Sequence, residues 1–84
     1  MRKEEIWSIS IQRSGNFFRN QEDVTEEGPN DFTYRSCRIH LTELKSNGMG
    51  IWAANRIRIR IEGEDSDVKE IYHRYFLQFL STGG

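Results

Sequence analysis

The chain has 84 residues, the length of one domain, and its formal net charge is −1. Charged residues make up 30% and aromatic residues 12% of the chain. This composition is typical of a globular protein and not of a disordered or a membrane protein. One cysteine excludes an internal disulfide framework, and neither a signal peptide nor a membrane-spanning apolar run is evident. We therefore expect a cytoplasmic protein without a membrane partner.

The first predicted element is a β-strand over residues 4–12, where apolar and polar side chains alternate. Residues 13–16 contain glycine and asparagine and predict a turn. A short return strand is predicted over residues 17–19.

An acidic, polar loop is predicted over about residues 20–31, which contain the only proline and few apolar side chains. This segment carries five acids and no cation: Glu22, Asp23, Glu26, Glu27 and Asp31. Such a run is typical of a solvated surface loop, but the first four acids are also a candidate contact surface for a basic partner.

Two further strands are predicted over residues 31–44 and 51–62, joined by a turn that contains an Asn-Gly pair. In the first, alternation directs Cys37, Ile39 and Leu41 toward a core. In the second, residues 56–61 alternate strictly between arginine and isoleucine, so the arginines occupy the face opposite the core.

The C-terminal region predicts an amphipathic helix that begins near Asp65 or Ser66, because apolar side chains then recur at steps of three and one. The final pair, Gly83 and Gly84, is similar to the tails of ubiquitin-like modifiers. Those tails leave the fold from a strand, whereas this pair follows a helix. We therefore interpret Gly83 as the C-cap of the helix.

Together these elements predict one α+β domain over residues 1–84. Its three- to four-stranded antiparallel sheet, in β-β-β-β-α order, packs one face against the C-terminal helix. The predicted core consists of Trp7, Ile9, Ile11, Cys37, Ile39, Leu41, Ile57, Ile59, Ile61, Val68, Ile71, Tyr72, Tyr75, Phe76, Phe79 and Leu80. The other sheet face is predicted to be open and to carry Trp52, Arg56, Arg58, Arg60, Phe32, Tyr34, Arg38 and His40.

Arginine and aromatic side chains dominate the energetics of protein interfaces. The predicted function is therefore non-catalytic binding to another protein, as an adaptor or a small stoichiometric inhibitor. The candidate partners are a different protein and a second copy of this chain. Trp52 with Phe32 or Tyr34 would anchor the contact, and the three arginines of residues 56–60 would orient it. The same residue types suit single-stranded nucleic acid, which is the alternative, and a solvated face with cross-strand ion pairs is the third interpretation.

No catalytic group emerges from the sequence. Cys37 and His40 are three positions apart in one strand and point to opposite faces, so they form no nucleophile–base pair. His73 falls on the polar side of the helix. The spacing of these residues matches no zinc site, and no glycine-rich phosphate loop occurs. We predict no enzyme activity, no cofactor and no metal.

Overall fold

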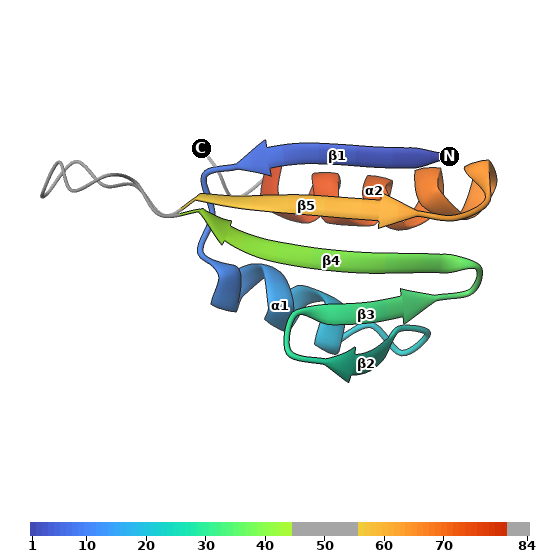
Figure 1. Ribbon diagram of the computed structural model, residues 1–84, viewed down its shortest axis with the longest axis horizontal. Helices are drawn as coiled ribbons and strands as arrows, with labels where there is room; N and C mark the ends of the chain where they lie inside the picture. The colour runs from blue at the N-terminus through green and yellow to red at the C-terminus, as the bar shows by residue number, and fades with distance from the viewer. Residues whose placement is uncertain (45–55, 81–84) are drawn as a thin grey trace, which may run out of the picture.

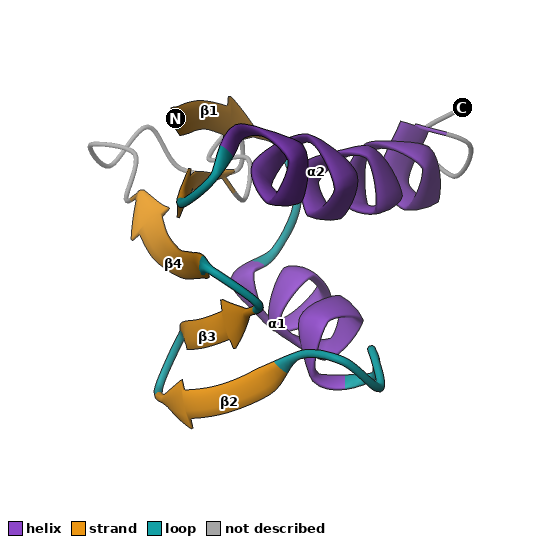
Figure 2. Ribbon diagram, turned by 90° about the vertical axis from the view of Figure 1, so that its right-hand side faces the viewer, coloured by secondary structure: helices purple, strands orange, loops and turns teal. Residues whose placement is uncertain are grey.

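The computed structural model describes residues 1–44 and 56–80 of the chain. Within them, five strands form one antiparallel sheet in the order β1-β5-β4-β3-β2, and both helices lie on one side of it (Figure 1; Figure 2). The elements are β1 (Arg2–Trp7), α1 (Ile11–Arg19), β2 (Thr25–Gly28), β3 (Asp31–Tyr34), β4 (Cys37–Leu44), β5 (Arg56–Glu62) and α2 (Asp65–Leu80). The predicted α+β class is confirmed, with more strands than expected and a second helix.

The N-terminal segment differs from the prediction, because residues 11–19 form helix α1 instead of a turn and a return strand. Ser10 caps this helix: its backbone is extended and its side chain accepts a hydrogen bond from the backbone N–H of Arg13 at 3.2 Å. Ser14 and Phe18, one helical turn apart, are buried against the rest of the fold. Residues 4–12, predicted as one strand, therefore comprise part of β1, a connection and the start of α1.

The acidic segment is also more ordered than a solvent loop. Its residues 25–28 form β2, which pairs antiparallel with β3. Asn30 in the connecting turn has φ 64°, a conformation that asparagine tolerates better than most residues. Val24 is buried in the core cluster and fixes the approach to β2.

A tight turn at Arg35, with φ 53°, divides the predicted strand over residues 31–44 into β3 and β4. Tyr34 pairs directly with Cys37 across this turn, so both side chains point to the same sheet face. In one continuous strand they would have pointed to opposite faces. The prediction that Phe32 and Tyr34 lie on the open face is therefore wrong, because both are buried on the helix side.

The two central strands agree with the prediction. β5 pairs with β4 on one side and with β1 on the other. In this register Ile59 of β5 lies opposite Leu41 of β4 and Glu5 of β1. Ile57 and Ile61 join Ile59 in the core, whereas the arginines between them point away. The predicted turn over residues 45–50, residues 51–55 of the predicted strand and the predicted C-cap at Gly83 lie outside the described residues.

The core lies between the sheet and the two helices. Phe18, Val24, Phe32 and Tyr34 belong to it although the prediction omitted them. Trp7, Ile9, Ile11, Tyr72 and Phe76 are only partly buried. Leu80 is 58% exposed, so its predicted place in the core is wrong. The buried stripe of α2 ends at Phe79, and Leu80 lies beside that stripe. The remaining members of the predicted core are confirmed as buried: Cys37, Ile39, Leu41, Ile57, Ile59, Ile61, Val68, Ile71, Tyr75 and Phe79.

Candidate functional site

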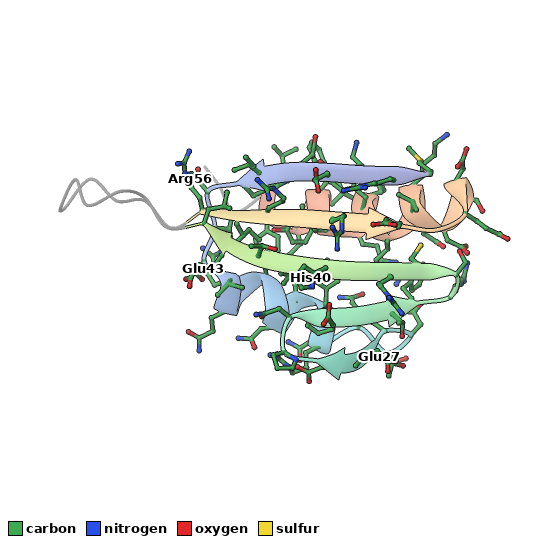
Figure 3. The ribbon with its side chains drawn as sticks, in the orientation of Figure 1. Glu27, His40, Glu43 and Arg56 are labelled. Carbon is green, nitrogen blue, oxygen red and sulfur yellow. The ribbon has the colours of Figure 1, made fainter. Side chains whose placement is uncertain are left out.

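We call the sheet surface opposite the two helices the open face; Figure 3 looks onto it, with His40 over β4. Because side chains alternate along each strand, every second residue contributes to this face. Its members on β1, β5, β4 and β3 are Arg2, Glu4, Ile6, Arg56, Arg58, Arg60, Glu62, Arg38, His40, Thr42, Leu44, Asp31 and Thr33. No described helix or strand covers it.

Charges on one part of the open face compensate one another. Arg60 Nε lies 3.2 Å from Glu62 Oε1, and Arg2 Nη2 lies 3.3 Å from Glu4 Oε2. The cross-strand register also alternates the charges, since Glu62 lies between Arg2 and Arg38. Exposed pairs of this kind contribute little to stability, but they leave this part of the face nearly neutral.

The other part, which we call the basic corner, consists of Arg56 and Arg58. The neighbours of Arg58 across the sheet are Ile6 and Thr42, and the neighbour of Arg56 on β4 is Leu44, so the register supplies neither with a carboxylate. Both side chains are exposed, and no carboxylate of the described residues forms an ion pair with either. Within residues 1–44 and 56–80, the basic corner therefore presents two guanidinium groups without a carboxylate partner, the type of group that arginine binds best.

His40 and Asp31 face each other across β4 and β3, with His40 Nδ1 2.5 Å from Asp31 Oδ1. Beside them, Glu27, Asp31, Thr33 and Arg38 line a hollow of about 470 Å³. The Thr33 hydroxyl donates a hydrogen bond to Glu27 Oε2 at 3.0 Å, which holds the acidic edge of this hollow. The hollow combines one cation with two carboxylates and suits recognition of a polar surface.

Cys37 lies on the other side of β4 from His40, as the spacing predicted. Its side chain is 2% exposed, and burial raises the pKa of the thiol. A buried thiol and a half-buried imidazole on opposite faces of the sheet cannot act as a nucleophile and its base. Among the described residues, no group of three histidine, cysteine or acidic side chains is arranged to hold a metal ion. No described helix is long and apolar enough to cross a membrane.

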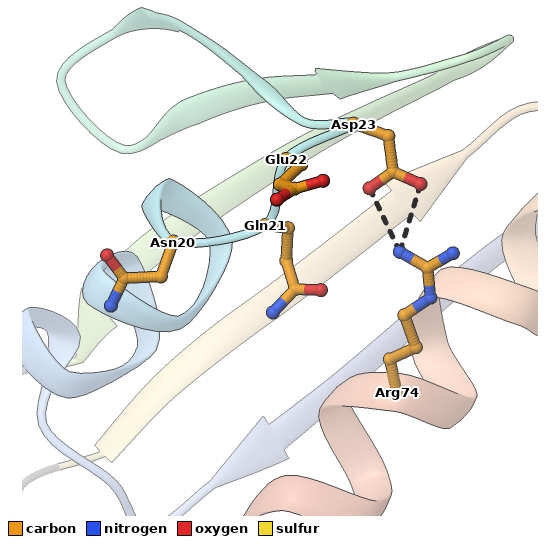
Figure 4. A pocket seen from close by; sticks show the side chains of 5 residues that line it. All are labelled: Asn20, Gln21, Glu22, Asp23 and Arg74. Atoms are coloured by element: carbon orange, nitrogen blue, oxygen red, sulfur yellow. Dashed lines mark hydrogen bonds and ion pairs between the residues drawn. The ribbon is translucent and has the colours of Figure 1, made fainter.

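The acidic residues predicted as a second contact surface do not share one surface. Asp23 accepts two hydrogen bonds from Arg74 at 3.0 and 3.2 Å, and Arg74 lowers the pKa of this carboxyl (Figure 4). Glu26 accepts two from Arg19 at 3.1 and 2.9 Å, which lowers the pKa of Glu26. Glu22 and Asp23 line a second hollow, together with Asn20, Gln21 and Arg74, whereas Glu27 belongs to the open face. Internal cations thus already engage two of these acids.

The aromatic anchors predicted for the interface are absent from the described open face. The Tyr34 hydroxyl donates to Glu70 at 2.5 Å, and its ring lies 5.1 Å from the guanidinium carbons of both Arg35 and Arg74. Burial and the Glu70 contact raise the pKa of Tyr34. Tyr34 therefore connects β3 to α2, and the Phe32 ring packs in the core at a tilt against that of Phe18. Trp52, the third predicted anchor, lies outside the described residues.

Residues 2–84 match the family model described as archaeal MoaD-like protein. The chain belongs to the archaeal MoaD-like protein family. The match spans the whole sheet, both helices and the C-terminal glycine pair, so the open face is part of the family's own region. No curated protein and no solved structure matches the chain.

The pairing of Asp31 with His40 is the feature of the site that sequence reasoning missed. The two residues are nine positions apart and would lie on one long strand without the turn at Arg35. The register that brings them together depends on that turn. The only local signal was the change from Phe-Thr-Tyr to Arg-Ser, where a polar pair interrupts the strand-forming residues.

Proposed function

We propose that this chain is a non-catalytic protein-binding module that docks an acidic segment of a partner on the open face. The observation that supports the proposal is the basic corner, where Arg56 and Arg58 lack a described carboxylate partner. Arginine binds carboxylates through two parallel hydrogen bonds, and it is enriched at interface hot spots. The partner would be occluded or bridged, as by an inhibitor or an adaptor.

The side chains around the basic corner favour a protein partner over nucleic acid. The burial of Phe32 and Tyr34 leaves the described open face without an aromatic ring on which a base could stack. Carboxylates of Glu4, Glu62 and Asp31 are interspersed among the arginines and would repel a phosphate backbone. A protein surface can match such an alternation of charges residue by residue.

The test is capture of cellular partners by the parent chain and by a variant that combines Arg56→Ala, Arg58→Ala and Arg60→Ala. We expect the triple variant to lose the partner, while Arg13→Ala, which removes an exposed guanidinium from α1, retains it. Retention of every partner by the triple variant would contradict the proposal. Polarisation of a labelled single-stranded oligonucleotide at low salt tests the nucleic-acid alternative, for which a flat signal is expected.

A further inference from the structure

Strand β1 forms one edge of the sheet, because β5 is its only strand neighbour among the described residues. At its start, the Gly63 N–H donates to Met1 O at 3.0 Å and the Met1 amine donates to Gly63 O at 2.7 Å. Bonded and non-bonded pairs alternate along an antiparallel ladder. The backbone groups of Arg2, Glu4 and Ile6 therefore point away from β5, toward the outer edge.

A groove of about 310 Å³ lies where β1 meets α2, and its lining is Met1, Lys3, Lys69, Tyr72, His73 and Phe76. Lys3 Nζ lies 4.4 Å from the centroid of the Tyr72 ring, and Trp7 packs edge-on against Phe76 at 5.9 Å. The groove thus combines the aromatic rings of Tyr72 and Phe76 with the cationic groups of Lys3, Lys69 and the Met1 amine. Two acids contact its lining residues: Glu5 accepts the hydrogen bond of the Tyr72 hydroxyl, and Asp65 Oδ1 lies 3.3 Å from the Met1 amine.

We propose that an extended segment of a partner protein adds to β1 as a sixth strand and fills this groove with its side chains. Backbone groups of the partner pair with Arg2, Glu4 and Ile6, as in other cases of strand addition to a sheet edge. On the helix side, an apolar side chain packs on Tyr72 and Phe76, and a carboxylate approaches Lys3 and Lys69. The groove lies on the helix side of the sheet, away from the basic corner, and the inference does not rest on the proposed function.

The charges of β1 favour a foreign segment over a second copy of the chain. Two β1 strands paired antiparallel about their centre would place Glu4 directly opposite its own copy on the open face. Like charges directly opposite each other destabilise a pair of strands. A segment with a neutral residue at that position avoids this repulsion and still satisfies the edge backbone.

The test uses a fluorescein-labelled peptide, Leu-Thr-Val-Thr-Glu-Thr, whose alternate side chains direct leucine, valine and glutamate to the helix side. Fluorescence anisotropy measures binding to the full chain, and amide hydrogen exchange measures protection. We expect saturable binding that slows exchange at Arg2, Glu4 and Ile6. Lys69→Glu, a change on the exposed side of α2, should raise Kd about tenfold, because it replaces an attractive charge by a repulsive one.

Matched controls separate this site from the open face. Arg58→Glu should leave peptide binding unchanged, and the same peptide N-methylated at alternate amides should not bind, because it cannot complete the ladder. Equal binding of the methylated peptide, or binding without protection at the β1 amides, would overturn the proposal. Protection that rises with the concentration of the protein alone would also overturn it, since the occupant would then be a second copy.

Discussion

The hydroxyl groups of Ser14 and Tyr75 lie 2.9 Å apart, buried where α1 packs against α2. Both side chains are fully buried, and the Tyr75 ring stacks on Phe18 with centroids 5.4 Å apart. The hydroxyl pair satisfies the two polar atoms that this packing removes from water. Burial also raises the pKa of Tyr75, because the charged phenolate is disfavoured away from water.

Removing one partner of this pair should be costly. Ser14→Ala leaves the Tyr75 hydroxyl buried without a partner and should lower the free energy of unfolding by about 1–3 kcal/mol. Adding Tyr75→Phe removes the orphaned hydroxyl, so the double variant should lose less than the sum of the two single variants. Urea denaturation of all four chains measures the coupling. Strict additivity would show that the hydroxyl contact contributes nothing.

Substitution by alanine should have opposite effects on the stability of the fold at Gly63 and at Gly15. A Cβ on Gly63 would lie 2.9 Å from Cys37 Cα and from Ser36 O, so Gly63→Ala should destabilise the fold by about 1–3 kcal/mol. A Cβ on Gly15 would meet only Arg19 Nη2, at 3.6 Å. Because Gly15 lies inside α1, Gly15→Ala should stabilise by about 0.5–1 kcal/mol.

Thermal unfolding of both variants checks this contrast. The Gly15 variant serves as the control for the general effect of a glycine-to-alanine change on the unfolded chain. A Gly63 variant as stable as the parent would mean that β5 and the turn beside Cys37 can separate without loss of packing.

Local patterns of the sequence predicted the parts of this fold that depend on one element. The alternation of residues 56–61 correctly placed Ile57 and Ile59 in the core and the arginines outside, because a buried face and a solvated face impose that period. The helical spacing of Val68, Ile71 and Tyr75 likewise predicted the buried stripe of α2. Both segments are long enough for the period to identify the element.

The parts that were missed depend on contacts between elements. Helix α1 is short, with buried positions Ser14, Gly15 and Phe18, and two of these are not apolar residues that would reveal a stripe. Its tertiary packing therefore outweighs the turn-forming character of Gly15 and its neighbours. The reversal at Arg35 also gave no glycine or proline signal. As a result, residues 31–44 were treated as one continuous strand, and Phe32 and Tyr34 were predicted on the wrong face of the sheet.

The ion pair of Asp23 with Arg74 should make stability depend on pH in the acid range. Because Arg74 lowers the pKa of Asp23 in the folded state, the pair stabilises the fold above the ordinary aspartate pKa and this contribution disappears as pH falls through the folded value. Asp23→Asn should therefore cost less than about 1 kcal/mol at pH 7, since the pair is partly exposed. Once the pH lies below the folded-state pKa of Asp23, the variant and the parent should become equally stable.

Urea denaturation of both chains at pH 7 and at low pH measures this difference. Glu22→Gln is the matched control, since Glu22 lies beside Asp23 in the same hollow. A stability difference between the Asp23 variant and the parent that persists unchanged at low pH would assign its effect to packing or hydrogen bonding instead of the charge.

Arginines of the basic corner and arginines of the helix side should differ in their contribution to stability. Arg56→Ala and Arg58→Ala remove exposed side chains without a described ion pair, so each should change the free energy of unfolding by less than about 0.5 kcal/mol. Arg74→Ala removes both the contact with Asp23 and the packing on the Tyr34 ring, and it should cost about 1 kcal/mol or more. A surface kept for recognition contributes little to folding. A large loss of unfolding free energy in the Arg58 variant would therefore mean that this guanidinium stabilises the sheet. It would also remove the reason to assign Arg58 to partner binding.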